Sequence, residues 1–366
     1  MNKHVATTRI APWGCKDCAY LHACGGLATQ QAMFGCFGGC GPCGVREGKC
    51  DYTCPRKPSQ FLRDWAEVGG LDPRQRRDLP SHSGALPLYV PMIRHGFRRK
   101  YPLALSTVSV NTFDVLDMKC APKFASADEF RAKFRLAANA QVLLVSVKDD
   151  RFIEAFWKHR TKERLAALGA LGPLSITVPN FSFFDDAPRT HTLRNLWRIV
   201  RSAEELADAG LNPIVHVNAL VEEDWHTWTR VLRNAPSARY VCKEFHTGLQ
   251  DPGRAAVAVE SLASLRDATR HDLHVIAVAG RRVAPLLAKH FDAFTIVDSV
   301  PFIASMSRKR LVVGGASVRE VDNPTPQGES LDDLLRDNIR EYQALVKACA
   351  ASGMGVIEER LESDEP

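Results

Sequence analysis

The residues with the clearest capacity for chemistry are cysteines near the start of the chain. The 366-residue sequence contains 11 cysteines, and eight of them follow the spacing C-x2-C-x5-C-x11-C-x3-C-x2-C-x6-C-x3-C. Glycines between them permit the unusual dihedral angles that a tight loop needs to gather sulfurs around one ion. Because the segment has almost no aliphatic residues, its order would come from coordination. The spacing predicts a metal centre whose ligands are Cys15, Cys18, Cys24, Cys36, Cys40, Cys43, Cys50 and Cys54.

Two kinds of centre fit eight thiolates. Zinc would form two sites of four cysteines each, whereas iron would form iron-sulfur clusters. Cys54-Pro55 at the end of the run is typical of ferredoxin-type ligation, and the irregular spacing favours clusters of the 4Fe-4S type. In addition, Cys36-Phe-Gly-Gly-Cys40-Gly-Pro-Cys43 resembles the C-x3-C-x2-C triplet of radical S-adenosylmethionine enzymes, which implies a redox enzyme as an alternative.

Composition changes after this run and indicates the domain organisation. Residues 1–68 form the cysteine-rich module, residues 69–85 a linker rich in Pro, Gly and Arg, and residues 86–366 the main domain. In the main domain, short apolar runs alternate with amphipathic segments. This pattern predicts an α/β fold, a (β/α)8 barrel of the TIM type, with an open doubly wound sheet as the alternative. The expected strands are 104–110, 141–147, 175–178, 214–218, 240–244, 274–279, 294–298 and 311–314.

Polar residues follow these runs, at the carboxyl ends of the strands where a barrel carries its chemistry. Asp298 ends the apolar run 294–297, so we expect its carboxylate to be partly desolvated and aimed at the barrel mouth, as suits a nucleophile or a general base. Lys243 and Glu244 are further catalytic candidates, although alternation lets only one of them face the pocket. Asn111, Asp114 and Lys148 also follow strands. The expected substrate-binding residues are Asn180, Ser182, Phe184, Asn218, His246, Arg281, Gly314 and Gly315.

Two segments resemble a known family. Phe291-Asp-Ala-Phe-Thr-Ile-Val-Asp298-Ser-Val-Pro301 resembles the nucleophile strand of the tRNA-guanine transglycosylase superfamily, which includes DNA-modifying 7-deazaguanine enzymes. Leu334-Leu-Arg-Asp-Asn-Ile-Arg-Glu-Tyr342-Gln-Ala-Leu345 is similar to that family's final helix. The resemblance implies that Asp298 attacks the anomeric carbon of a nucleoside, expels guanine and holds the sugar until a modified base replaces it. It also places Asn180 and Ser182 where the family reads the base.

The chain departs from the family pattern in two places. No acid stands where the family carries a general base after its first strand, and Asp114 lies beyond that position. The family's zinc site near the C-terminus has no equivalent cysteine cluster here. The segment Val178-Pro-Asn-Phe-Ser-Phe-Phe-Asp-Asp186 also resembles an uncharacterised phage and mobile-element family, which implies a role in phage defence.

Charge and hydropathy indicate the partners. The net charge is +6, and basic clusters such as Arg94 to Lys100 and Arg308 to Arg310 suit nucleic acid, DNA or RNA, with protein partners as a further expectation. No stretch approaches 18 uncharged apolar residues, and the start lacks the apolar centre of a secretory signal, so we expect a cytoplasmic chain without a membrane partner. Two function classes remain: an enzyme acting on a nucleic-acid base through Asp298, and a nucleic-acid-binding or assembly subunit with a catalytically silent barrel.

Overall fold

The structure is a computed structural model that describes residues 52–54, 58–184, 187–314, 317–326 and 329–362. These residues form two compact units. The first contains the described residues up to Arg76, together with Phe181–Arg201 and Asn218–Asn234. The second contains Arg77–Asn180, Ser202–Val217 and the chain from Ala235 onward. All strands of the barrel lie in the second unit, which is therefore called the barrel unit.

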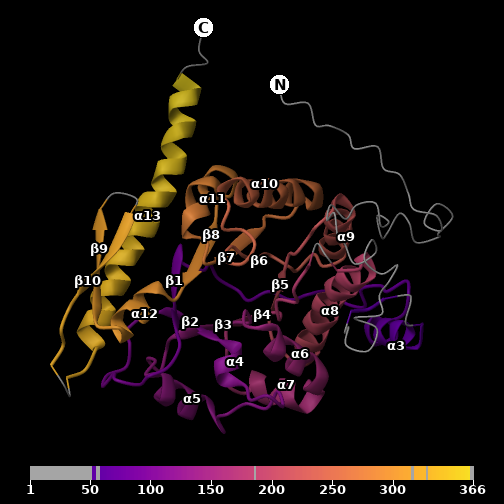
Figure 1. Cartoon of the computed structure of the whole chain (residues 1–366), viewed down its shortest axis with the longest axis horizontal. Coiled ribbons are helices and arrows are strands. Elements are labelled where there is room, and N and C mark those ends of the chain that lie inside the picture. The colour runs from indigo at the N-terminus through magenta and orange to yellow at the C-terminus, as the bar shows by residue number, and fades with distance from the viewer. Residues whose placement is uncertain (1–51, 55–57, 185–186, 315–316, 327–328, 363–366) are drawn as a thin grey trace, which may run out of the picture. The chain divides into compact units, whose positions relative to one another are not determined.

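Eight parallel strands close into a barrel in chain order (Figure 1). The first strand pairs with the second, with Met92 opposite Ser109, and also with the last, with Pro91 opposite Asp298. This closure confirms the (β/α)8 barrel and excludes the open sheet. The strands are β1 (Tyr89–Ile93), β2 (Thr107–Asn111), β3 (Gln141–Val145), β4 (Ser175–Thr177), β5 (Pro213–His216), β6 (Tyr240–Glu244), β7 (His274–Val278) and β8 (Phe294–Asp298).

The barrel has eight strands, as expected, but two of the segments differ: β1 was not expected, and the segment 311–314 is not a barrel strand. The sequence does not mark β1 as a strand, because Pro91 interrupts it and proline is usually excluded from strands with neighbours on both sides. The expected barrel strand 311–314 is wrong. It belongs to β9 (Lys309–Gly314), which pairs antiparallel with β10 (Ser317–Asp322) in a separate two-stranded sheet. Only Leu311 of β9 is buried, so its apolar run packs on one side rather than inside the barrel.

Helices connect the strands, and several begin at a side chain that caps them. Ser126 accepts a hydrogen bond from the N–H of Glu129, and Asp251 accepts one from the N–H of Arg254. The last helix packs against β1, β9 and two other helices of the barrel unit and stands beside β9 and β10 in Figure 1. The helices are α3 (Pro58–Val68), α4 (Thr112–Val115), α5 (Ala127–Phe134), α6 (Asp150–His159), α7 (Lys162–Gly169), α8 (Arg189–Asp208), α9 (Glu222–Arg233), α10 (Pro252–Thr269), the 3-10 helix η3 (Arg281–Val283), α11 (Ala284–His290), α12 (Val300–Met306) and α13 (Asp332–Glu362).

Alternate residues of the strands fill the interior of the barrel. Val90, Leu143 and Val297 belong to this buried core. His216 pairs in register with the core residue Cys242, so it shares the inward face, where its Nε2 lies 3.2 Å from Thr177 Oγ1. Complete burial lowers the pKa of His216 to about 3. The interior therefore holds a neutral imidazole.

A second group of imidazoles closes the amino-terminal end of the barrel. The ring of His82 stacks on Tyr240 at 4.3 Å, and the ring of His274 lies 4.9 Å from the same tyrosine. His82 Nδ1 lies 2.6 Å from Ser175 Oγ, and His274 Nε2 lies 2.8 Å from Thr295 Oγ1. Burial lowers the pKa of both histidines, that of His274 to about 4. This end of the barrel is packed and hydrogen-bonded.

We predict that acidification weakens the barrel at pH values below the ordinary histidine pKa of 6.5, down to the values of about 4 and 3 for His274 and His216. The unfolded chain takes up protons in this window and the folded chain does not, so the stability present above it is lost as the pH falls. Urea unfolding followed by fluorescence between about pH 7 and pH 4 measures the slope. His274→Gln should flatten it, whereas His226→Gln, at an exposed position, should not. Equal slopes in the wild type and His274→Gln would contradict the prediction.

Candidate active site at the carboxyl ends of the barrel strands

Asp298, the last residue of β8, is held by a polar network. Its Oδ1 accepts a hydrogen bond from the N–H of Val300 at 2.9 Å, in the first turn of α12. Its Oδ2 accepts one from the hydroxyl of Tyr342 on α13 at 2.8 Å. Arg281, in the turn after β7, is hydrogen-bonded to Tyr342, and its charge acts on Asp298. The adjoining turn of α12 and a tyrosine 44 residues along the chain therefore hold the carboxylate of Asp298.

Burial and hydrogen bonding act on Asp298 in opposite directions. Desolvation raises its pKa, whereas the bonds from Val300 and Tyr342 and the charge of Arg281 lower it, and the resulting pKa lies above the ordinary value. The ring of Tyr89 lies 5.3 Å from that of Tyr342. Within the described part of the chain, the buried hydroxyl of Tyr89 has no hydrogen-bond partner. This end of β8 thus combines a desolvated carboxylate with an unsatisfied hydroxyl.

The side chain of Asp298 points away from the barrel interior, in contrast to the sequence expectation that it aims at the mouth. Val297 belongs to the interior core, so alternation along β8 turns Asp298 to the outer face. Its partner Tyr342 lies on α13, which packs on that outer face. The carboxylate lies at the rim beside α12 and α13, and it is partly exposed there.

Lys243 and Glu244 at the end of β6 are separated by alternation, as the sequence predicts. Glu244 shares the inward face of Cys242, and its Oε1 accepts hydrogen bonds from the N–H groups of His246 at 2.6 Å and Thr247 at 2.7 Å. Glu244 therefore caps the following loop, in which His246 is exposed. Lys243 donates from Nζ to the carbonyl of Val217 at 3.0 Å, and burial lowers its pKa to about 8. A lysine with this pKa is partly neutral near physiological pH, the form that an amine base requires.

Of three further predicted binding residues, Asn180, Gly314 and Gly315, only Asn180 is found beside the carboxyl end of a barrel strand. Asn180 lies in the barrel unit, and its N–H donates to the carbonyl of Ser146 at 3.0 Å, at the carboxyl end of β3. Gly314 ends β9 and is therefore not at the end of a barrel strand. This placement overturns the reason for predicting it as a binding residue. Gly315 lies outside the described residues.

Ser182, Phe184 and Asn218 belong to the first unit rather than to the barrel unit. Asn195 Nδ2 donates to the carbonyl of Ser182 at 2.9 Å, and Asn218 Nδ2 donates to the carbonyl of Phe181 at 3.2 Å. The ring of Phe184 lies 6.4 Å from that of Tyr52. Inside their own unit these residues stabilise loops, and their role in binding a base stays a prediction.

The predicted metal ligands fall almost entirely outside the described residues. This holds for Cys15, Cys18, Cys24, Cys36, Cys40, Cys43 and Cys50. Cys54 is described and buried. The preceding residue, Thr53, donates from its N–H to His191 Nδ1 at 3.2 Å and from its hydroxyl to Asp64 at 2.8 Å. Among the residues that the structure describes, no group of three or more His, Cys, Asp or Glu could hold a metal ion, so the metal centre stays a prediction.

The structure also assembles a cluster of charges that the sequence did not show. Asp114, in α4 after β2, accepts hydrogen bonds from Arg94 Nε at 2.6 Å and from Lys148 Nζ at 2.8 Å. Arg94 follows β1 and Lys148 follows β3, so three neighbouring strand ends contribute to this rim ion cluster. Although burial opposes it, hydrogen bonding to Arg94 and Lys148 holds the pKa of Asp114 below its ordinary value. The sequence marked Asp114 and Lys148 as rim residues, but only the closed barrel shows that they meet Arg94.

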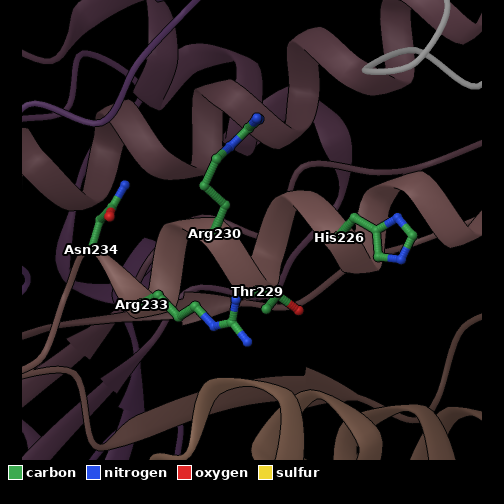
Figure 2. A pocket seen from close by; sticks show the side chains of 5 residues that line it. All are labelled: His226, Thr229, Arg230, Arg233 and Asn234. Atoms are coloured by element: carbon green, nitrogen blue, oxygen red, sulfur yellow. The ribbon is translucent and has the colours of Figure 1, made fainter.

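A cavity of about 410 Å³ lies on α9, in the first unit. None of the predicted site residues lines it. Figure 2 shows its lining side chains leaving the helix in different directions, so they do not converge on one point. The lining residues are His226, Thr229, Arg230, Arg233 and Asn234.

Comparison with known proteins gives no family for this chain. No protein-family model matches it, and no curated protein matches it. In the described part of the chain, the structure contains no helix with the length and apolarity needed to span a bilayer.

We predict that Asp298→Asn stabilises the fold at neutral pH. The folded state raises the pKa of Asp298, so the wild type loses stability as the pH rises from the ordinary value of 3.8 through that raised value, and the amide carries no such cost. Thermal unfolding at neutral and at acidic pH measures the effect. The advantage of the variant should disappear at acidic pH, and Asp292→Asn, at an exposed position between α11 and β8, should show none. A destabilised Asp298→Asn protein at neutral pH would mean that the anion stabilises the fold.

Proposed function

We propose that the chain is a base-modifying enzyme of nucleic acids that works by transglycosylation, with Asp298 as the nucleophile. The observation that carries the proposal is the hydrogen bond between Tyr342 and Asp298. The two segments that resemble the transglycosylase superfamily, 291–301 and 334–345, meet through this bond at the carboxyl end of β8. That end of the strands is where (β/α)8 barrels carry their chemistry.

The proposed reaction exchanges one base for another in two balanced steps. A carboxylate oxygen of Asp298 forms a bond to C1′ of the nucleoside, and the C1′–N9 bond breaks with its electron pair going to guanine, which takes up a proton from water. A nitrogen of the incoming base then attacks C1′ and loses its proton to water, and the bond between C1′ and the carboxylate breaks, which regenerates the Asp298 anion. Tyr342 acts as a positioning residue, because its hydrogen bond favours the ionised carboxylate that the first step needs.

The cysteine-rich segment supplies a donor set that suits a metal. We propose that the eight thiolates from Cys15 to Cys54 would hold iron-sulfur clusters of the 4Fe-4S type, which take four thiolates each, with two zinc ions as the alternative. Such metals would order a segment that has few aliphatic residues, and the ordered module would clamp the nucleic acid. The clusters of Arg and Lys in the chain support a polyanionic substrate.

Replacing Asp298 with Asn should lower base exchange by at least about a thousandfold, because an amide cannot form the covalent intermediate. Incorporation of labelled guanine into tRNA, single-stranded DNA and duplex DNA measures the rate. Tyr342→Phe should lower kcat by roughly tenfold with little change in KM, since it removes only the positioning bond. Asp292→Asn is the matched control and should exchange at the wild-type rate. Wild-type exchange by Asp298→Asn would eliminate Asp298 as the nucleophile.

A nucleic-acid-binding or assembly subunit with a silent barrel is the second candidate function. It is favoured by the outward direction of Asp298 and by the two hydrogen bonds that already occupy its oxygens. Under this alternative, Asp298→Asn and the wild type bind nucleic acid equally and neither exchanges guanine. The exchange assay therefore separates the two functions.

Metal content tests the proposed module independently of the barrel. We predict that anaerobically purified protein absorbs broadly near about 400 nm and contains iron and sulfide in similar amounts. Replacing Cys36, Cys40 and Cys43 with Ala should lower this absorbance together with the iron content, whereas Cys349→Ala, outside the run, should keep both. A colourless protein that contains zinc would establish the zinc alternative.

A further inference from the structure

The rim ion cluster of Arg94, Asp114 and Lys148 is partly open to solvent. The exposed fractions of the three side chains are 35%, 17% and 22%. Arg94 uses Nε and Nη2 toward Asp114, and Lys148 uses one of its three N–H donors toward the same carboxylate. In the described part of the chain, these bonds leave the Nη1 of Arg94 and two donors of Lys148 for another acceptor.

A third cation lies beside this cluster. Lys123 donates from Nζ to the carbonyl of Asp114 at 3.1 Å and to that of Phe113 at 3.3 Å. Burial, together with the charge of Lys148, lowers the pKa of Lys123, while Asp114 opposes the change. Two cations therefore bind the carboxylate of Asp114, and a third, Lys123, binds its backbone carbonyl. Asp117 also acts on Lys123, but it is exposed, so the half-buried part of the cluster has more positive than negative charge.

Two further acidic residues stand at the start of α6, Asp149 as its N-cap and Asp150 as its first residue, and both are exposed. Asp149 lies 3.7 Å from Arg151, which is also exposed. Lys148 and Arg151 both lie over the ring of Phe152, at 4.5 Å and 4.8 Å from its centre. This ring holds Lys148 at the rim and shields one side of its ammonium group from water.

We infer that the rim ion cluster, with Lys123, binds a phosphate group. A guanidinium and two ammonium groups close to one another match a phosphate in charge and supply the hydrogen-bond donors that it needs. The carboxyl ends of the barrel strands, where this cluster lies, are where such barrels bind ligands. Asp114 holds the cations in place and weakens their attraction for the anion. The site does not depend on the chemistry at Asp298, so it goes beyond the proposed function.

Because the cluster contains both cations and a carboxylate, substitutions of the two kinds should change phosphate affinity in opposite directions. Lys148→Gln should weaken phosphate binding by roughly tenfold, because it removes one of the cations. Asp114→Asn should tighten binding, because it removes the competing carboxylate, whereas a residue with only a structural role would weaken binding or leave it unchanged. Arg94→Gln should weaken binding as Lys148→Gln does. Lys119→Gln, at an exposed position of the neighbouring loop, is the matched charge control and should bind like the wild type.

Binding is measured on the full chain with two probes, inorganic phosphate and a fluorescent single-stranded oligonucleotide, at constant ionic strength. Far-ultraviolet circular dichroism and thermal unfolding check that each variant is folded. If only the oligonucleotide responds to the substitutions, the phosphate belongs to a nucleic-acid strand, and if both respond, free phosphate also occupies the site. Either result supports the inference. Equal affinities in all variants, or weaker binding by folded Asp114→Asn, would overturn it.

Asp298→Asn separates this inference from the proposed function. That variant should keep wild-type affinity for both probes while it loses base exchange. A failure of exchange in the wild type leaves the binding results valid, and a failure of the binding results leaves the exchange assay valid.

Discussion

Closure of the parallel sheet is the constraint on which the rest of the structure depends. A closed barrel has no strand edge with unpaired backbone groups, and β1 provides the closure by pairing with β8 from Tyr89 opposite Ile296 to Pro91 opposite Asp298. The strands then have to turn alternate side chains inward, where Val90 and Val297 pack. Pro91 and Asp298 are consequently turned outward. The direction of the candidate carboxylate follows from closure, not from its own chemistry.

Titratable groups in the interior of the barrel differ in charge state from those at its rim. In the interior, His216 and His274 stay neutral because burial lowers their pKa values. At the rim, Asp114 stays ionised because two cations bind it, and Asp298 accepts two hydrogen bonds. Desolvation penalises a charge most where no partner is available, so the charged groups are found where partners and water both reach. Groups suited to chemistry are therefore concentrated at one end of the strands.

The sequence predicted the barrel because apolar strands alternate with amphipathic helices, a pattern that local composition carries. The prediction missed β1 because Pro91 interrupts its apolar residues. It included 311–314 because this hairpin strand, with one buried residue, has an apolar run like that of a barrel strand. Asp298 was predicted as a candidate because it ends an apolar run. The direction of its side chain was not predicted, because it depends on the register with β1 and on Tyr342, 44 residues away in the chain. In the rim ion cluster, Asp114 contacts Arg94, 20 positions away, and Lys148, 34 positions away. A local sequence pattern cannot predict contacts between residues so far apart.

Asp298 and the rim ion cluster lie on neighbouring strands, because β8 pairs with β1 and Arg94 of the cluster follows β1. Asp298 ends β8, Arg94 follows β1, and Asp114 follows β2. Neighbouring strands lie about 4.8 Å apart, so the rim from β8 to β2 spans roughly 10 Å, which a sugar and a neighbouring phosphate can bridge. In the proposed reaction, a phosphate bound at this distance would position the sugar without taking part in the chemistry. A phosphate directly beside Asp298 would instead raise the pKa of that carboxyl further and favour its protonated form, which cannot act as the proposed nucleophile.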